Sequence, residues 1–212
     1  MNDQLLHPLA MITGAVLSGG SSSRFGASKG LVKLDGNPMV SHVVRALREV
    51  ADDILVAVAP GTASSYSDIL DEDVLIVEDE RTGEGPLQGL ITSLEPAHGE
   101  RVIVSPCDTP LLRTDVCRLL IEMSDRRDGA VPMIRGYLEP LHACYVRDPC
   151  LKAFRKTLTS GRRKPKDAYE HLDIRVVEEK EIAAIDPDFD SFLNINSRRE
   201  FDIAEGRLLQ RR

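Results

Sequence analysis

The sequence is poor in aromatic residues and contains no tryptophan. Five phenylalanines and four tyrosines among 212 residues offer few of the stacking platforms that single-strand nucleic-acid binders use. The formal net charge is −7, and no long tract of lysine and arginine is present. Duplex binding depends largely on neutralising phosphates, so this composition argues against a nucleic-acid partner. We therefore expect the chain to act on a small molecule.

Long hydrophobic runs are also missing. No apolar stretch approaches the roughly 20 residues that are needed to span a bilayer. The first residues, MNDQLLHPLAMITG, contain no basic leader and no long apolar segment followed by a small-residue cleavage site. We therefore expect no signal peptide, no membrane partner and a cytoplasmic location.

Cysteine is scarce, and its spacing excludes two kinds of site. The four cysteines form no CxxC pair and have no histidine at metal-ligand spacing, which argues against a zinc site and against a disulfide framework. We expect buried thiols at Cys107, Cys117, Cys144 and Cys150.

What the chain does contain is an alternation of strand and helix patterns. With 42% hydrophobic residues, 212 residues can bury one substantial core. Runs rich in β-branched residues occur at MITGAVL, DILVAVA, VLIVED and RVIVSP, and helical spacing of apolar residues occurs at 38–50, 86–96 and 114–123. The alternation predicts an α/β fold, a Rossmann-like, doubly wound and mostly parallel sheet that helices cover on both faces.

The pattern changes after Asp128. AVPMI, LEPLHACYV and IRVVEE have the composition of strands, and 149–158 and 198–209 have helical spacing. We expect these elements to extend the same sheet as a mixed C-terminal part with an antiparallel strand. The basic segment GRRKPKDA, residues 161–168, predicts an exposed loop leading into a short helix. We divide the chain into an N-terminal extension, residues 1–10, and a single domain, residues 11–212.

A glycine-rich and serine-rich segment, LSGGSSSRFGASK, directly follows the first strand pattern. Ligands of open parallel sheets bind beyond the carboxyl ends of the strands. Gly19 and Gly20 let the backbone turn sharply and direct N–H groups at phosphate oxygens, while Arg24 and Lys29 add positive charge. The segment is neither a Walker A loop nor a GxGxxG fingerprint. A flexible surface loop is the alternative, but the position after a buried strand favours a phosphate-binding loop.

Two carboxylates and a helix start follow later strand patterns. Asp108, in PCDTP after RVIVSP, is placed to hold Mg²⁺, which prefers one or two carboxylates together with substrate phosphates, or to cap the next helix. Asp79 ends VLIVED at the same predicted edge and could equally be an ordinary turn residue. Gly85 precedes Pro86, where the backbone could approach a ligand at a helix N-terminus or only form a tight turn.

Three later features are each weaker evidence for a functional site when taken singly. In LNIN, Asn194 and Asn196 lie on the same side of an extended segment, where they could bind a polar ring or form an asparagine turn. His142 lies in a strand-like run, where a core histidine with satisfied hydrogen bonds is more common than a catalyst. A basic loop could accept an anionic second substrate or simply be solvated; its charged residues are Arg162, Arg163, Lys164 and Lys166.

Taken in order, these segments resemble the molybdenum cofactor guanylyltransferase family. The matching segments are AVLSGGSSSRFGASKGLVKLDGNPMVSHVV, VLIVED, GPLQGL, SPCDTPLL, EPLHACY and FLNINSRREF, which together extend over nearly the whole chain. The pattern LxGGxSxRxGxxK is common to many nucleotidyltransferases. Its combination with GPLxGL, PCDxP and the late NxN element is much more specific.

The resemblance implies a Mg²⁺-dependent enzyme that transfers GMP from GTP to the terminal phosphate of molybdopterin and releases pyrophosphate. The implied catalytic residues are Lys29, Arg24 and Asp108, with Asp108 holding the metal. The implied binding residues for nucleotide and pterin are Leu17, Ser18, Gly19, Gly20, Lys29, Asp79, Gly85, Asp108, Asn194 and Asn196. The two asparagines, with the basic loop, would face the pterin. Proteins that deliver the cofactor and molybdoenzymes that accept it are further implied partners.

Two positions depart from the family pattern. Ala57 stands where members often carry an asparagine that helps with guanine, and Ser18 replaces the usual alanine. Base selectivity therefore stays open between GTP and CTP, the latter giving a cytosine dinucleotide. Related alternatives are a sugar-phosphate acceptor and a nucleotide-binding protein without catalysis.

Overall fold

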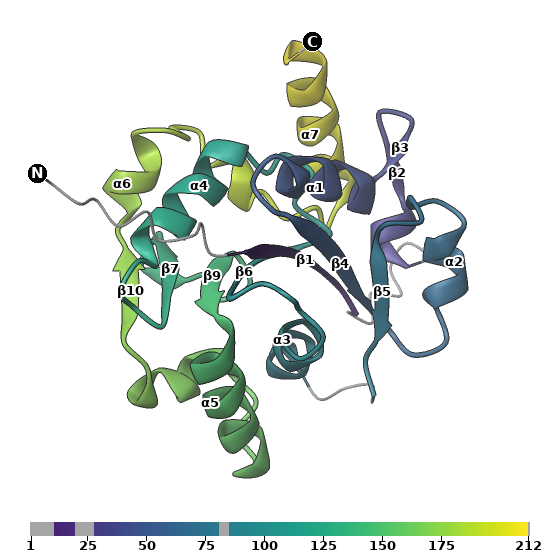
Figure 1. Cartoon of the computed structure of the whole chain (residues 1–212). Coiled ribbons are helices and arrows are strands. Elements are labelled where there is room, and N and C mark those ends of the chain that lie inside the picture. The colour runs from purple at the N-terminus through teal and green to yellow at the C-terminus, as the bar shows by residue number, and fades with distance from the viewer. Residues whose placement is uncertain (1–10, 20–27, 81–84, 212) are drawn as a thin grey trace, which may run out of the picture.

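A mixed, eight-stranded sheet runs through the computed structural model, which describes residues 11–19, 28–80 and 85–211 (Figure 1). Its strands follow the order β10-β7-β9-β6-β1-β4-β5, and β8 pairs with β7. Their bounds are β1 (Ile12–Ser18), β4 (Asp53–Val58), β5 (Leu75–Glu78), β6 (Arg101–Pro106), β7 (Gly129–Ile134), β8 (Tyr137–Leu138), β9 (Ala143–Val146) and β10 (Ile174–Val177). The predicted α/β fold class is confirmed.

The direction of pairing divides the sheet as the sequence predicts. β1 pairs in parallel with β4 and β6, and β4 pairs in parallel with β5. β9 runs antiparallel between β6 and β7, and β10 returns parallel to β7. The first half of the chain therefore builds the parallel part, and the chain after Asp128 builds the mixed extension.

Helices cover both faces of this sheet (Figure 1). The helices are α1 (Met39–Arg48), α2 (Ala63–Ser67), α3 (Pro86–Leu94), α4 (Thr114–Met123), α5 (Arg147–Thr159), α6 (Glu179–Ala183) and α7 (Arg198–Gln210). α3 and α5 pack on one face, where Ala15 is buried, and α1 and α4 pack on the other, where Val16 is buried. Successive residues of a strand point to opposite faces. Burial on both sides explains why the strand sequences are almost continuously apolar.

A third apolar cluster anchors α7 to the body of the protein. Its buried members are Leu34, Met39, Leu111, Ile195 and Ala204. Leu34 belongs to a short hairpin formed by β2 (Lys33–Leu34) and β3 (Asn37–Pro38), and Leu111 follows β6. The cluster therefore packs the last part of the chain against the segment that contains Asp108.

Some predicted boundaries are wrong. A strand over 138–146 is not formed, because β8 ends at Leu138 and β9 begins only at Ala143. Between them Pro140 lacks an N–H donor, and the His142 N–H closes a turn on the Glu139 carbonyl at 3.0 Å. Pro38 lies in β3 rather than in the first helical turn, and α1 begins at Met39.

Other differences lie at the ends of elements. α5 begins at Arg147, two residues before the predicted start. β10 ends at Val177 because Glu178 forms the capping box of α6 with Glu181. The proposed N-terminal extension, residues 1–10, lies outside the described residues. Within the described part of the chain, no helix is both long and apolar enough to cross a membrane.

Candidate active site

The carboxyl ends of four neighbouring strands meet at one edge of the sheet. Ser18 at the end of β1 lies in register with Val58 at the end of β4. The Asp79 N–H donates to the Val58 carbonyl at 2.9 Å, and the Cys107 N–H donates to the Leu17 carbonyl at 3.0 Å. This edge is where an open parallel sheet binds its ligands.

Lys29 lies between two acceptors that come from distant parts of the chain. Its ammonium group is paired with the Asp108 carboxylate and donates to the side-chain oxygen of Asn196 at 2.6 Å. The side chains of Lys29 and Asp108 are only 11% and 17% exposed. The structure thus brings together three residues that the sequence singled out separately.

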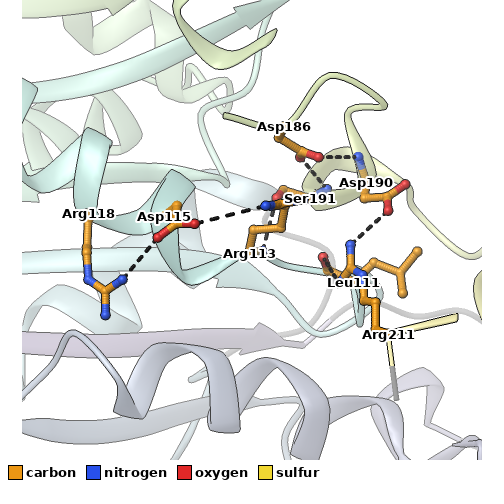
Figure 2. A network of polar contacts seen from close by, with 8 residues as sticks. All are labelled: Leu111, Arg113, Asp115, Arg118, Asp186, Asp190, Ser191 and Arg211. Atoms are coloured by element: carbon orange, nitrogen blue, oxygen red, sulfur yellow. Dashed lines mark hydrogen bonds and ion pairs between the residues drawn. The ribbon is translucent and has the colours of Figure 1, made fainter. Parts of the chain in front are cut away.

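The segments that carry Asp108 and Asn196 are joined by main-chain hydrogen bonds. The Ile195 N–H donates to the Asp108 carbonyl at 2.9 Å. The Arg113 N–H donates to the Ser191 hydroxyl at 3.0 Å (Figure 2). These contacts fix the register between the chain after β6 and the chain before α7.

Two charged residues strengthen the same connection (Figure 2). The buried Asp186 carboxylate accepts the N–H groups of Asp190 and Ser191 at 3.2 and 2.9 Å. Arg211, at the end of α7, donates to the Leu111 carbonyl at 3.1 Å and to the Asp190 carboxylate at 2.8 Å. The last helix therefore helps to hold both site-forming segments in place.

His142 bridges these segments from inside the core. Its side chain is 3% exposed, its Nε2 atom lies 3.1 Å from the Thr109 hydroxyl, and its ring lies 5.1 Å from that of Phe192. Burial lowers the pKa of His142 to about 3, although a hydrogen bond with the backbone of Ser191 acts in the opposite direction. A neutral, buried ring agrees with the interpretation of His142 as a core histidine.

Asp79 lies directly against the first strand-to-loop junction. A Cβ atom added to Gly19 would lie 2.3 Å from Asp79 Oδ2, so a larger residue would require the carboxylate or the junction to shift. Burial raises the pKa of Asp79, and a hydrogen bond from the Thr92 side chain acts in the opposite direction. Asp79 is thus a half-desolvated carboxyl group at the edge where the strands end.

Carboxylate oxygens that could act as ligands of Mg²⁺ are present at this edge. Among the described residues, Asp79 Oδ1 and Asp108 Oδ1 are buried and have no hydrogen-bond partner. Such carboxylate oxygens are hard ligands of the kind that Mg²⁺ prefers. The alternative role of Asp108 as a helix cap is wrong, because the residue that precedes α4 is Arg113.

Tyr66 is a residue at this edge that the sequence interpretation missed. Its hydroxyl lies 2.5 Å from the hydroxyls of both Ser18 and Ser28. It belongs to the short helix α2, and its side chain is fully buried. Nothing in the sequence ASSYS marks this tyrosine, because its partners lie 48 and 38 positions away.

Four predicted site residues remain, of which the structure describes Gly85 and Asn194. Gly85 precedes α3 with φ at +80°, and a Cβ atom there would lie 3.6 Å from Arg163. The basic loop therefore lies against the start of α3, and it leads into a 3-10 helix at Pro165–His171 as predicted. Asn194 is partly buried. Gly20 and Arg24 lie outside the described residues.

Ala57, which departs from the family pattern, and the four cysteines all lie at buried positions. Ala57 is buried in β4, in register with Leu17. The four cysteines are buried free thiols, as predicted, and burial raises the pKa of Cys107 to about 12. Cys107 is therefore not a reactive thiolate at neutral pH.

Comparison with known proteins places this arrangement in a family. Residues 14–176 match the family model described as the MobA-like NTP transferase domain. The chain belongs to this family. A molybdenum cofactor guanylyltransferase from Desulfosudis oleivorans is 35% identical over 196 residues, which are 92% of this chain and 94% of that protein. A probable molybdenum cofactor guanylyltransferase from Geobacillus sp. is 29% identical over 192 residues, covering 90% and 96%.

Solved structures share the MobA-like fold. Molybdopterin-guanine dinucleotide biosynthesis protein A from Archaeoglobus fulgidus superposes with a TM-score of 0.78 at 22% identity, over 93% of this chain and 99% of that one. A 4-diphosphocytidyl-2C-methyl-D-erythritol synthase from Anaerococcus prevotii gives 0.72 at 12% identity, over 94% and 96%. The predicted family and the nucleotidyltransferase class are confirmed.

Proposed function

We propose that this chain transfers GMP from GTP to the terminal phosphate of molybdopterin, forming molybdopterin guanine dinucleotide and pyrophosphate. Membership of the MobA-like family supports this, as does the name of the Desulfosudis oleivorans relative. The structural observation that carries the proposal is the position of Lys29, held between Asp108 and Asn196 at the carboxyl edge of the sheet.

The reaction is a direct transfer. A terminal phosphate oxygen of molybdopterin attacks the α-phosphorus of GTP in line, a new P–O bond forms, and the bond to the β-phosphate oxygen breaks as pyrophosphate leaves. The nucleophile is already anionic, so no general base is required. The protein therefore contributes positioning and neutralisation of charge.

Lys29 suits the phosphate-binding role. An ammonium group can donate three hydrogen bonds, and among the described residues two acceptors, on Asp108 and Asn196, orient it. The third donor would bind a phosphate oxygen of the nucleotide. Arg24 is proposed to supply a second positive charge, as the sequence predicts.

Asp108 is the proposed Mg²⁺ ligand, and Asp79 is proposed to contact the nucleotide. The buried Asp108 Oδ1 atom without a partner among the described residues supports this assignment. A bound Mg²⁺ would offset phosphate charge. The Asp108 carboxylate also orients Lys29, so its replacement would disturb both cations.

Other parts of the site follow from the sequence predictions. Leu17, Ser18 and Gly19 are proposed to line the base and ribose, Gly20 to belong to the phosphate-binding loop, and Gly85 to approach the nucleotide. Asn194 and Asn196 are proposed to face the pterin, with the basic loop as a further anion-binding element. We propose that residues 11–212 act as one domain in the cytoplasm and that delivery proteins and molybdoenzymes exchange the cofactor with it.

Nucleotide selectivity with Mg²⁺ tests the proposal. Ligand stabilisation grows as RT ln(1 + [L]/Kd), so thermal unfolding with GTP, CTP, UTP and ATP at equal concentration ranks their affinities. We expect GTP to give the largest shift and molybdopterin to trigger pyrophosphate release. A clear preference for CTP would overturn guanylyl transfer. Binding of GTP without pyrophosphate release on molybdopterin would support a protein without catalysis.

A further inference from the structure

One buried phenol connects the end of β1 to the residue before Lys29. The Tyr66 hydroxyl lies 2.5 Å from the Ser18 hydroxyl and 2.5 Å from the Ser28 hydroxyl. Tyr66 is 0% exposed and Ser18 is 5% exposed. Each hydroxyl carries one proton, so the phenol can donate to one serine and accept from the other. The three groups form a continuous hydrogen-bonded chain from β1 through α2 to Ser28.

Ser28 begins the tight turn that carries Lys29. The Leu31 N–H donates to the Ser28 carbonyl at 2.9 Å, and the Val32 N–H donates to the Lys29 carbonyl at 3.2 Å. Gly30 lies directly on the hydroxyl groups: an added Cβ atom would lie 2.5 Å from the Ser18 hydroxyl oxygen and 2.9 Å from that of Tyr66. The turn is therefore in contact with the hydroxyl chain at two of its residues.

We propose that Tyr66 is a positioning residue whose hydroxyl holds Ser28, and through it places Lys29 between Asp108 and Asn196. A lysine side chain is long and flexible, so the place of its ammonium group depends on the backbone that carries it. The consequence for catalysis rests on the proposed function, in which Lys29 binds the phosphates of GTP. The effect of Tyr66 on the turn at Ser28 does not depend on the proposed function.

Tyr66→Phe separates this role from simple packing. The Tyr66 ring belongs to the apolar cluster under α1 and α4, and phenylalanine keeps that ring while it removes the hydroxyl. In the full chain without nucleotide, we expect the Leu31 and Val32 amides to exchange hydrogen roughly tenfold faster, because the partly buried Ser28 hydroxyl loses its partner.

Tyr145→Phe is the matched control. Tyr145 is equally buried, and its hydroxyl donates to the Pro140 carbonyl and contacts the Tyr169 hydroxyl, each at 2.7 Å. It pairs with Val102 near the start of β6, at the other end of the strand from Asp108. We expect this variant to leave exchange at Leu31 and Val32 unchanged.

Two further variants test the path through Ser28. Gly30→Ala should accelerate the same exchange by steric displacement of the turn. In the double variant Ser28→Ala with Tyr66→Phe, the same amides should exchange no faster than in Tyr66→Phe alone. The effects of two substitutions that remove the same contact do not add.

Hydrogen exchange and turnover are then measured on the same proteins. We expect Tyr66→Phe to lower kcat/KM for GTP about tenfold, in step with the faster exchange, and Tyr145→Phe to change neither. Unchanged exchange at Leu31 and Val32 in Tyr66→Phe, or an equal change in Tyr145→Phe, would overturn the positioning role. If the wild-type protein does not use GTP, the proposed function fails, and the exchange comparison still decides the role of Tyr66.

Discussion

The Lys29 ammonium donates a hydrogen bond of 2.6 Å to the side chain of Asn196, 167 positions later in the sequence. Asn196 is held in turn by Glu200, whose carboxylate accepts the Asn196 N–H at 2.7 Å. Ser197 caps α7 by accepting the Glu200 N–H at 3.3 Å. The start of the last helix thus positions a group that contacts Lys29, the lysine that we propose binds phosphate.

Lys29→Ala is expected to lower kcat/KM for GTP by about 100-fold or more, because the positive charge that we propose offsets the phosphates is lost. Steady-state pyrophosphate release measures the effect. Lys33→Ala is the control, since Lys33 is exposed in β2, and its kcat/KM should stay within about twofold of wild type. Equal losses in the two variants would contradict a specific role for Lys29.

Asp108→Asn is expected to remove the response to Mg²⁺ while the protein stays folded. Thermal unfolding with GTP is compared in Mg²⁺ and in a chelator; the wild-type shift should need Mg²⁺, and the shift of the variant should not depend on it. Asp115→Asn, at a mostly exposed carboxylate in the first turn of α4, should respond as the wild type does. A wild-type Mg²⁺ response in Asp108→Asn would disprove the metal assignment.

Gly19→Ala is expected to weaken GTP binding, because the new methyl group would lie 2.3 Å from Asp79 Oδ2, so that the Asp79 carboxylate or the junction after β1 must shift. Nucleotide titration measures the change in Kd. The matched substitution Gly206→Ala meets nothing within 4 Å in α7 and should leave Kd unchanged. It should also stabilise the fold by about 1 kcal/mol through helix propensity. Unaltered GTP affinity in Gly19→Ala would argue against the close approach.

We expect the buried His142 to make the folded protein less stable in acid. Its pKa is about 3 in the folded protein and about 6.5 when unfolded, so only the unfolded chain gains a proton between these values. The contribution of the neutral His142 ring to the free energy of unfolding is fully present well above pH 6.5 and falls as the pH drops below that value. Between pH 7.5 and 5.5 it should lower the free energy of unfolding by about 1.4 kcal/mol.

Urea unfolding at the two pH values tests this contribution of His142. His142→Gln should lose about 1.4 kcal/mol of the wild-type difference between pH 7.5 and 5.5. His98→Gln is the control, because the side chain of His98 is 71% exposed, and it should keep most of that difference. An identical pH dependence in wild type and His142→Gln would show that the ring is not held neutral by burial.

Much of the fold could be predicted because strands and helices leave local patterns. The apolar runs at β1, β4 and β6 and the spacing in α4 depend only on which faces are buried, so they are visible in short windows of sequence. The strand over 138–146 was predicted wrongly because its composition is strand-like, while Pro140 and the turn at His142 interrupt it. Turn chemistry overrode composition there.

The sequence by itself determined the alternation of strands and helices, the buried thiols and the residue types in the segments that follow the strands, including Lys29, Asp79 and Asp108. Only the tertiary structure decided which of these side chains meet. The pairing of Lys29 with Asn196 and the link from Tyr66 to Ser28 join residues that are far apart in the chain. Periodicity encodes each element through its own backbone geometry, whereas such contacts depend on how separate elements pack, which no local pattern records.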